Sequence, residues 1–563
     1  GLQAGTYTIT PSRYLYGFSP PSRTVTVPPN ATGQDFVQAP VVDLSVNRIE
    51  VAQVFIEQND PISGTPIPLI ARKDTLVRVY VGVSGAASVG GVTARLHIRQ
   101  SDGTETIDSN PINVWPVRAK QTPDPYSLQD TINFRPPTRL LQGDVTFWAD
   151  VDPENRIPET DEGHNTGGDV SKTFEAGKPV RIAITQIGYR SFPWGPYAYA
   201  DWNTIVRADA MLRQVYPVAE GDVQYYYQPG DPARVQCLWG NQDACWAEFH
   251  NQLKAFWRRV DDEGKWVGGT PPHTLVGWVP GAARDAGGTC GQANRLSPRE
   301  VVIADYCDKY RGQPPALTPE PIARVLAHEV GHLLNSKPEL QHAKNQSNED
   351  DPQCNAEPDG QDPLYPTPPS YPRGSIFAHG LDLRNLKVLE PNKAPLATYD
   401  LMSYCSPAWI SPYNYFKLNT GFTDAAASRA SDAEPNAPVR KLLVSGLVFT
   451  PTLQVELNPF YVLNTTSAAD ATSGADYCLE TWNASGVVLD KRCFDLAFVN
   501  RETYAPASVD GFALAIPYPN GTAQIALTRK GTSIASRAVS PHAPTVRLLS
   551  PNGGERWAGS GTH

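Results

Sequence analysis

One short segment carries side chains that can do metal chemistry, namely His328-Glu329-Val330-Gly331-His332. Histidines four residues apart on a helix point the same way, about one helical pitch apart, so both imidazoles can bind a single tetrahedral Zn²⁺. Glu329 cannot bind the same ion from its position, but it can take a proton from a water on the metal as that water attacks a carbonyl group. The spacing therefore predicts two zinc ligands and a catalytic base on one helix.

The residues around this segment predict the helix itself. Thr318 and Pro319 supply an N-cap and a first-turn proline, and the helix is expected to run from Pro319 to about Asn335. At about 100° per residue, an apolar stripe falls on one face and the chemical residues fall on another. The stripe comprises Ile322, Leu326, Val330 and Leu333, and the other face carries Val325, His328, Glu329 and His332.

A third ligand is needed, because a catalytic zinc ion usually takes three protein ligands and keeps one position open. Pro338 prevents a simple continuation of the helix, so the chain must turn after about Asn335 and can bring a later side chain back to the metal. Three candidates follow in the sequence: His342, Glu349, and the pair Asp350 and Asp351.

Two segments together resemble the metzincin family of zinc peptidases. His328 to Asn335 is similar to the family pattern H-E-x-x-H-x-x-G-x-x-H, although Asn335 stands at the family's glycine and Pro338 at its third histidine. The second segment, Tyr399-Asp-Leu-Met402-Ser-Tyr404-Cys405, resembles the Met-turn of that family. The resemblance covers residues 177–430.

This resemblance implies how the site is completed. A four-residue insertion ahead of the last ligand makes His342 the third zinc ligand. Met402 then forms an apolar floor beneath the ligands, and Tyr404 matches a tyrosine that in some members approaches zinc and stabilises an oxyanion. The family also implies an edge strand that pairs with extended substrate, and Glu300 to Asp305 lies in the corresponding place.

Residue patterns divide the chain into five parts. Period-two runs between proline-rich turns indicate the end of a small β-domain at residues 1–40 and an Ig-like β-sandwich at 41–176. Strands alternating with helices over 177–430 indicate an α/β domain with a mixed sheet and the active-site helix. A second β-sandwich is expected at 431–545, followed by a linker or the start of a further module at 546–563. The predicted fold is multidomain, a metzincin-like catalytic domain flanked by all-β Ig-like sandwiches.

Two acidic segments are candidates for a Ca²⁺ site. Val151 to Thr166 resembles the terminal hairpin of bacterial adhesion-related Ig-like modules, and we expect a solvated acidic turn there, with a Ca²⁺ site as the alternative. Asn348 to Asp362 could bind Ca²⁺ beside the cleft, although a surface loop anchored by a disulfide is the expected reading.

Eight cysteines without a C-x-x-C motif favour disulfides in an oxidising compartment over free thiols, a redox motif or a cysteine zinc site. We therefore expect a secreted, extracellular protein, and the adhesion-like hairpin indicates a bacterial one. Local spacing pairs Cys237 with Cys245, Cys290 with Cys307 and Cys478 with Cys493, which leaves Cys354 with Cys405.

The composition of the chain limits the kinds of partner that the protein is expected to bind. A formal net charge of -10 without a Lys/Arg cluster argues against nucleic acid, which needs a basic footprint. No run reaches the roughly 18 apolar residues of a membrane span. The chain opens inside a strand-like run, Gly5 to Thr10, so we expect that a precursor has been trimmed.

The expected function is a zinc-dependent endopeptidase that hydrolyses peptide bonds of extracellular proteins by a zinc-bound water activated by Glu329. One alternative is a protease directed at glycoproteins such as mucins. Another is an adhesion or binding protein with an inactive peptidase domain, against which Glu329 argues because an inactive homologue would be free to lose it.

Overall fold

The computed structural model describes residues 2–113, 117–190, 195–230, 233–236, 242–281, 289–295, 300–306, 321–334, 340–343, 361–392, 397–421, 439–465, 469–470, 472–501 and 504–540. The chain forms two compact units. The first comprises residues 1–253, 266–431 and 500–505, and the second comprises 254–265, 432–499 and 506–563. No helix among the described residues is long and apolar enough to cross a membrane.

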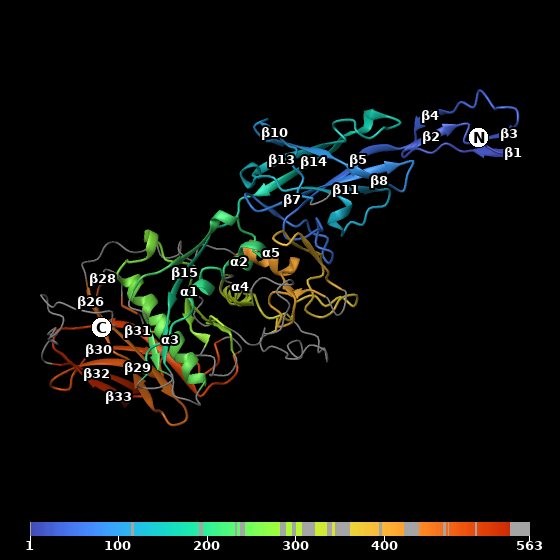
Figure 1. Cartoon of the computed structure of the whole chain (residues 1–563). Helices are drawn as coiled ribbons and strands as arrows, with labels where there is room; N and C mark the ends of the chain where they lie inside the picture. The colour runs from blue at the N-terminus through green and yellow to red at the C-terminus, as the bar shows by residue number, and fades with distance from the viewer. Residues whose placement is uncertain are drawn as a thin grey trace, which may run out of the picture. The chain divides into compact units, whose positions relative to one another are not determined.

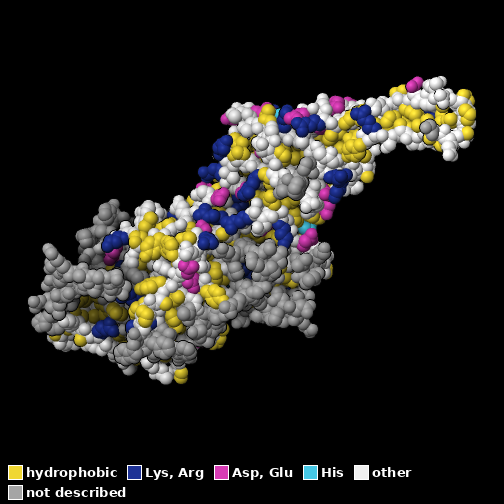
Figure 2. All heavy atoms as spheres, viewed as in Figure 1, with side chains coloured by type: hydrophobic (Ala, Val, Ile, Leu, Met, Phe, Trp, Pro, Cys, Tyr) yellow, Lys and Arg dark blue, Asp and Glu magenta, His cyan; other side chains and the backbone are white. Residues whose placement is uncertain are grey.

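The first 40 residues form two small antiparallel sheets at the N-terminal end of the first unit (Figure 1). β1 (Gly5–Ile9) pairs with β3 (Arg23–Val27), and β2 (Tyr16–Ser19) pairs with β4 (Val37–Pro40). Few of their side chains are buried, and Figure 2 shows hydrophobic side chains on their surface, where Tyr14 and Val37 are exposed. On the face drawn in Figure 2, Lys and Arg side chains are scattered and form no single broad patch.

A β-sandwich follows, as the period-two runs predict. One sheet has the order β10-β9-β13-β14-β6, a second has the order β12-β7-β5, and β11 pairs with β8. Alternate side chains from both sheets meet in one core, which includes Val79, Ile98 and Phe147. The strands are β5 (Asp43–Ala52), β6 (Leu69–Ile70), β7 (Leu76–Ser84), β8 (Ser88–Val92), β9 (Ala94–Gln100), β10 (Glu105–Asp108), β11 (Val117–Lys120), β12 (Ile132–Phe134), β13 (Gly143–Val151) and β14 (Thr166–Glu175).

The acidic hairpin of this sandwich is less solvated than expected. Asp152 and Glu159 are both buried. Each carboxylate accepts a hydrogen bond from a backbone amide, which offsets the cost of burying it. Asp152 Oδ2 accepts from Ile157 N at 2.7 Å, and Glu159 Oε2 accepts from Leu44 N at 2.6 Å. These carboxylates shape the hairpin and join it to β5.

The α/β part contains the mixed sheet that the sequence predicts. Its order is β17-β15-β19-β21-β20, with every pair parallel except β20 and β21. All residues of β19 and β21 are buried, which matches their unbroken apolar runs. The strands are β15 (Val180–Gln186), β17 (Val223–Tyr227), β19 (Thr274–Val279), β20 (Gly291–Ala293) and β21 (Glu300–Ala304).

Two expectations for this part were wrong. The residue pattern of Asp201 to Val215 predicts one helix, but this stretch is split into α1 (Trp202–Ile205) and α2 (Ala210–Val215). The strand β21 is not at the sheet edge, because β20 pairs with its outer side. The segment between β19 and β21 thus folds back as an outermost strand, and all three of its residues are buried.

The remaining elements of the α/β part are short except for one helix. The long helix is α3 (Gln242–Asp262), which matches the helix expected from Ala244 to Val260. The others are β16 (Gly188–Arg190), β18 (Arg234–Gln236), α4 (Pro321–Leu334), β22 (Gly380–Asp382), β23 (Lys387–Leu389), β24 (Tyr399–Asp400), β25 (Ala408–Trp409) and α5 (Pro412–Gly421).

The second unit contains another all-β sandwich. One sheet joins β26 to β27, β28 and β31, and the other has the order β30-β29-β32-β33. Side chains from both sheets, such as Val444, Leu479 and Ile525, form its core. The strands are β26 (Val439–Phe449), β27 (Val455–Leu457), β28 (Tyr461–Thr465), β29 (Tyr477–Asn483), β30 (Val488–Phe494), β31 (Val509–Pro517), β32 (Thr522–Arg529) and β33 (Thr532–Ala538). The predicted module at 546–563 lies outside the described residues.

The disulfide between Cys478 and Cys493 is confirmed, and it links the neighbouring strands β29 and β30. Cys245, Cys290 and Cys405 are also disulfide-bonded. The other three pairings stay predictions because Cys237, Cys307 and Cys354 lie outside the described residues.

The first sandwich and the α/β part share one hydrophobic core. Phe55, which follows β5, meets Tyr415 of α5 edge to face at 5.6 Å between ring centroids. Trp409 Nε1 donates to Val54 O at 3.0 Å. The core of the α/β part therefore includes side chains that precede it by more than 100 residues in the sequence.

We predict that Phe55→Ala lowers the free energy of unfolding by about 3–5 kcal/mol, because it opens a cavity in this shared core. Ile107→Ala is the matched control, since Ile107 is 53% exposed and its loss should cost less than about 0.5 kcal/mol. Chemical denaturation followed by tryptophan fluorescence measures both. Equal, small losses would contradict a shared core.

Candidate metal centre

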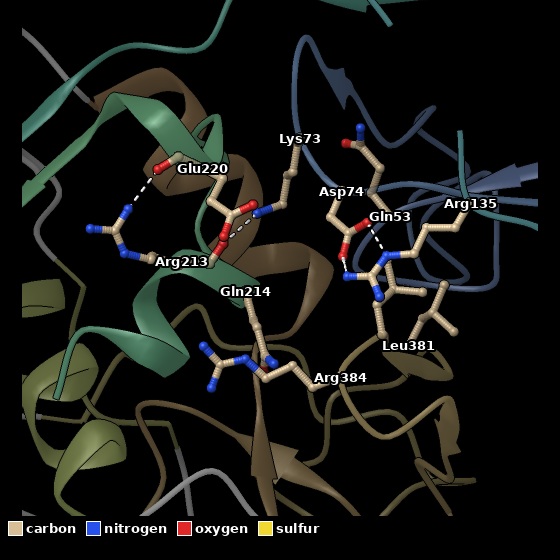
Figure 3. A pocket seen from close by; sticks show the side chains of 10 residues that line it. Gln53, Lys73, Asp74, Arg135, Arg213, Gln214, Glu220, Leu381 and Arg384 are labelled. Atoms are coloured by element: carbon tan, nitrogen blue, oxygen red, sulfur yellow. Dashed lines mark hydrogen bonds and ion pairs between the residues drawn. The ribbon is translucent and has the colours of Figure 1, made fainter. Parts of the chain in front are cut away.

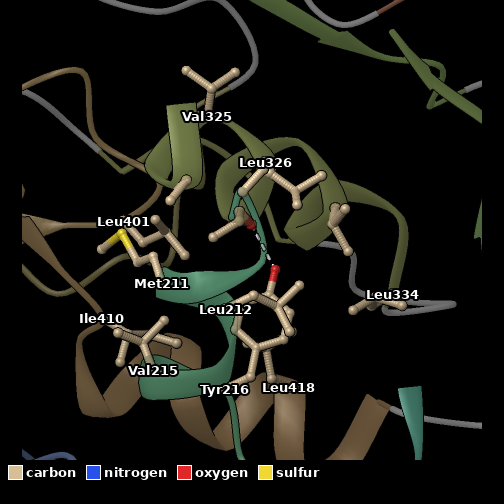
Figure 4. Packing of buried hydrophobic residues seen from close by; sticks show 14 of the residues in the cluster. Met211, Leu212, Val215, Tyr216, Val325, Leu326, Leu334, Leu401, Ile410 and Leu418 are labelled. Atoms are coloured by element: carbon tan, nitrogen blue, oxygen red, sulfur yellow. Dashed lines mark hydrogen bonds between the residues drawn. The ribbon is translucent and has the colours of Figure 1, made fainter. Parts of the chain in front are cut away.

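The helix α4 (Pro321–Leu334) carries the His328–His332 segment and is held by its apolar face. Leu326 and Val330 are fully buried. In Figure 4, Leu326 lies near Leu212 of α2, and the Tyr216 hydroxyl after α2 donates to the Ala327 carbonyl of α4 at 2.6 Å. This contact fixes the helix one residue ahead of His328. The predicted ends at Pro319 and Asn335 lie outside the described residues.

Three histidines converge beside α4. His328, His332 and His342 each offer a ring nitrogen, and these nitrogens lie within 4.8 Å of one another. All three residues are buried, with ring centroids 4.8 to 5.3 Å apart. The spacing of His328 and His332 therefore places both rings on one side of the helix, and His342 joins them from a separate segment.

Backbone carbonyls fix the tautomers of two of these rings. His328 Nδ1 lies 2.8 Å from Leu401 O, and His332 Nδ1 lies 2.7 Å from Leu340 O. A carbonyl oxygen only accepts, so each Nδ1 must carry the proton and each Nε2 must present a lone pair. Metal-binding histidines are oriented by this kind of second hydrogen bond.

The buried setting of His332 also favours metal binding. Its Nε2 is buried and has no hydrogen-bond partner among the described residues. Burial, helped by the nearby His342 and His328, holds the pKa of His332 well below its ordinary value. The ring is therefore neutral at pH 7, which is the form that binds a metal ion. Three imidazoles within reach of one point fit a Zn²⁺ ion.

Glu329, which follows His328 on α4, is buried, and strand β20 limits where its side chain can go. A Cβ atom added at Gly291 would lie 2.8 Å from Glu329 Cγ and 2.9 Å from Glu329 Oε1. Only a glycine leaves room for this side chain at that point of β20. No residue pattern predicts this role of Gly291.

Met402 packs directly under the helix. A Cβ atom added at Gly331 would lie 3.2 Å from Met402 Sδ and 3.2 Å from Leu340 Cδ1. The absence of a side chain at Gly331, within the histidine segment, thus lets the thioether lie against the backbone between the two ligands. Met402 is fully buried, as expected for an apolar floor.

Arg324 joins α4 to the segment that carries Tyr404. Its guanidinium donates to Ser403 O at 2.8 Å, to Cys405 O at 2.7 Å and to Ser406 Oγ at 2.6 Å. Tyr404 is half-buried, and its hydroxyl lies 3.2 Å from His342 Nε2. The phenol therefore belongs to the site. Sequence analysis missed Arg324, although a charged residue on a mostly apolar helix is a usable signal.

His342 is attached to the Met402 segment through its neighbour. Ala343 N donates to Met402 O at 3.0 Å, and His342 O accepts from Asp362 N at 2.8 Å. The competing ligands Glu349, Asp350 and Asp351 lie outside the described residues. His379 lies elsewhere, and its Nδ1 is 2.6 Å from Glu57 Oε1.

Within the described ranges, the three histidines are the single group of three or more His, Cys, Asp or Glu side chains placed to hold a metal ion. The acidic hairpin at Val151 to Thr166 does not form such a group. The other acidic segment, residues 348–362, for which Ca²⁺ binding is the alternative to a surface loop, lies outside the described residues except for its last two positions.

No family model and no curated protein matches this chain. Among solved structures, it is similar to a solution NMR structure of a CARDB domain from Pyrococcus furiosus, at 21% sequence identity and a TM-score of 0.15. The match covers 24% of this chain and 97% of that domain. A TM-score of this size does not establish a shared fold.

We predict that the purified chain binds one equivalent of zinc and that His342→Ala weakens this binding by at least about 100-fold, because a ligand is lost. His164→Ala is the control, since that imidazole is 60% exposed in the acidic hairpin. Zinc content after dialysis against a weak chelator measures the effect. Loss of zinc in Glu349→Ala, with zinc retained in His342→Ala, would move the third ligand to the glutamate.

Proposed function

We propose that this protein is a zinc-dependent endopeptidase of the metzincin type that hydrolyses peptide bonds of extracellular proteins. The observation that carries the proposal is the convergence of His328, His332 and His342 beside the buried carboxylate of Glu329. Three imidazoles and a carboxylate are a minimal set for metal-assisted hydrolysis of an amide.

Zinc is the favoured metal because three imidazole donors with fixed tautomers suit a borderline-soft ion, whereas calcium and magnesium prefer oxygen ligands. His328, His332 and His342 would hold it. When bound, zinc supplies a Lewis acid that polarises a carbonyl group and lowers the pKa of water to about 7.

Glu329 is placed to act as the general base. It follows His328 directly on α4, about 100° further round the helix, and β20 confines its side chain. A carboxylate in this position accepts the proton of an attacking water and later returns it to the leaving amine. Burial of Glu329 keeps bulk water from competing for that proton.

Tyr404 is placed to stabilise the oxyanion that develops on the attacked carbonyl. Its hydroxyl lies within hydrogen-bond distance of the histidine cluster, and Arg324 holds the carbonyls on both sides of it. A positioned donor of this kind strengthens as charge develops in the transition state. Tyr404 is half-buried, so it can also be reached by substrate.

The surroundings support an extracellular setting. The Cys478–Cys493 disulfide, together with the bonded Cys245, Cys290 and Cys405, is typical of proteins from oxidising compartments. All-β modules on both sides of the α/β part are suited to place an enzyme on a surface or a glycoprotein. We therefore propose a secreted bacterial protease whose substrates are proteins, glycoproteins included.

We predict that Glu329→Gln keeps zinc but lowers cleavage of unfolded casein by about 10²- to 10⁴-fold, the usual contribution of a general base. Glu263→Gln, a surface change elsewhere in the chain, should leave cleavage unchanged. A peptidase assay with zinc analysis on the same samples separates the two effects. A zinc-loaded wild-type chain that cleaves nothing would favour the adhesion protein instead.

We also predict that Gly291→Ala lowers kcat by about 10- to 100-fold with little change in zinc content, because a misplacement of about 1 Å is that costly to catalysis. The new methyl group would lie 2.7 Å from Val325 Cγ1 and 2.8 Å from Glu329 Cγ, so both side chains must shift, whereas no histidine is among its nearest contacts. Gly221→Ala, at an exposed position where an added Cβ atom meets nothing within 4 Å, serves as a check on overall stability. Unchanged kcat in Gly291→Ala would show that the carboxylate position is not limiting.

A further inference from the structure

A second polar cavity lies in the first unit, where the sandwich meets the α/β part. It has a volume of about 80 Å³, several times the roughly 10–15 Å³ that one water needs. Its lining contains four cationic side chains and two carboxylates, with Leu381 and Leu383 as an apolar part of the wall (Figure 3). None of these residues belongs to the histidine site.

Lys73 is the least usual residue of this lining. It lies in the turn between β6 and β7 and is only 3% exposed, yet no carboxylate of the described residues binds its amine. Lys73 Nζ donates to Arg213 O at 2.9 Å and to Val218 O at 3.4 Å. A charged ammonium has three N–H groups, so the third one has no acceptor among the described residues.

The other charges differ in whether they are already paired. Arg135 and Asp74 bind each other through two hydrogen bonds, and Arg213 binds Asp209. Arg384, which is exposed at the cavity, has no carboxylate within ion-pair distance among the described residues. Lys73 and Arg384 are therefore the two cations of this cavity that have no carboxylate partner among the described residues.

A buried amide acceptor also lacks a partner here. Gln214 Oε1 is buried and has no hydrogen bond within the described part of the chain. Figure 3 shows Gln214 and Arg384 close together on one side of the cavity, with Lys73 on another. Buried polar groups are nearly always hydrogen-bonded, so the protein alone does not complete this site.

We propose that this cavity binds a small oxyanion, such as a sulfate, phosphate or carboxylate group, between the Lys73 amine and the Arg384 guanidinium. An oxyanion would accept the third N–H of Lys73 and one or two N–H groups of Arg384, which are strong charge-assisted bonds. Rotation of the Gln214 amide would add a further donor. The site is independent of the peptidase activity.

The binding should depend on pH because Lys73 can lose its charge near neutrality. Burial lowers the pKa of Lys73 to about 7, although the carboxylates of Asp74 and Glu220 raise it in part. Arg135, Arg213 and Arg384 also line the cavity and stay charged. Below about pH 7 the ammonium attracts the anion, and above it the neutral amine does not. Affinity is therefore full in mild acid and falls as the pH rises through and above 7.

The test is a sulfate titration of the full chain by calorimetry, with chloride at equal ionic strength as the blank. Sulfate stays a dianion throughout, so any pH dependence comes from the protein. We expect saturable binding near about pH 6 and binding about 10- to 100-fold weaker near about pH 9. Arg384→Gln should weaken binding about tenfold, whereas Lys387→Gln, on the neighbouring β23, should not.

Lys73→Met tests the amine directly, and it should abolish the pH dependence as well as tight binding. Because that change could perturb folding, circular dichroism is recorded on each variant, and Arg384→Gln, at an exposed position, gives an independent result. Acetate in place of sulfate distinguishes a carboxylate site from a site for tetrahedral anions. The proposal is overturned if sulfate binds wild type and Arg384→Gln equally, if its affinity is the same at both pH values, or if none of the anions binds.

Discussion

Two hydrogen bonds, each from an imidazole ring to a backbone carbonyl, hold the components of this site together. His328 donates to Leu401 and His332 donates to Leu340, and each acceptor precedes another component of the site. Leu401 is followed by Met402, and Leu340 stands two residues ahead of His342. The bonds that fix the tautomers therefore also hold the apolar floor and the third histidine against the helix. A change in either carbonyl segment would alter ring orientation and ligand geometry together.

Burying so many polar groups is costly unless each one finds a partner. Asp400, which is fully buried, accepts from Met402 N, Asn414 Nδ2 and Ser411 N, all at 2.7 Å. Burial raises the pKa of Asp400, while these hydrogen bonds partly offset that effect. Arg324 is satisfied by two carbonyls and a hydroxyl. The Met402 segment is thus held by polar contacts on both sides rather than by apolar packing alone.

The sequence revealed what depends on local spacing. His328 and His332 lie on one side of α4, with Glu329 between them in the sequence, because four residues make about one helical turn. The strands β15 and β21 are predicted by their short apolar runs. Arg324, Gly291 and Gly331 escaped notice because their importance comes from contacts with segments far away in the chain. The order of β20 and β21 was missed for a similar reason, since a three-residue strand carries almost no periodic signal.

The all-β part ahead of the α/β part is more than an attached module. Phe55 and Ile70 lie in the same hydrophobic core as Leu326 and Val330 of α4. A close-packed core transmits a change in one side chain to its neighbours. The position of α4, and with it the separation of the imidazoles, therefore depends on side chains contributed by the sandwich. An α/β part cut out at residue 177 would lose those side chains, so its histidines would no longer be held by the same packing.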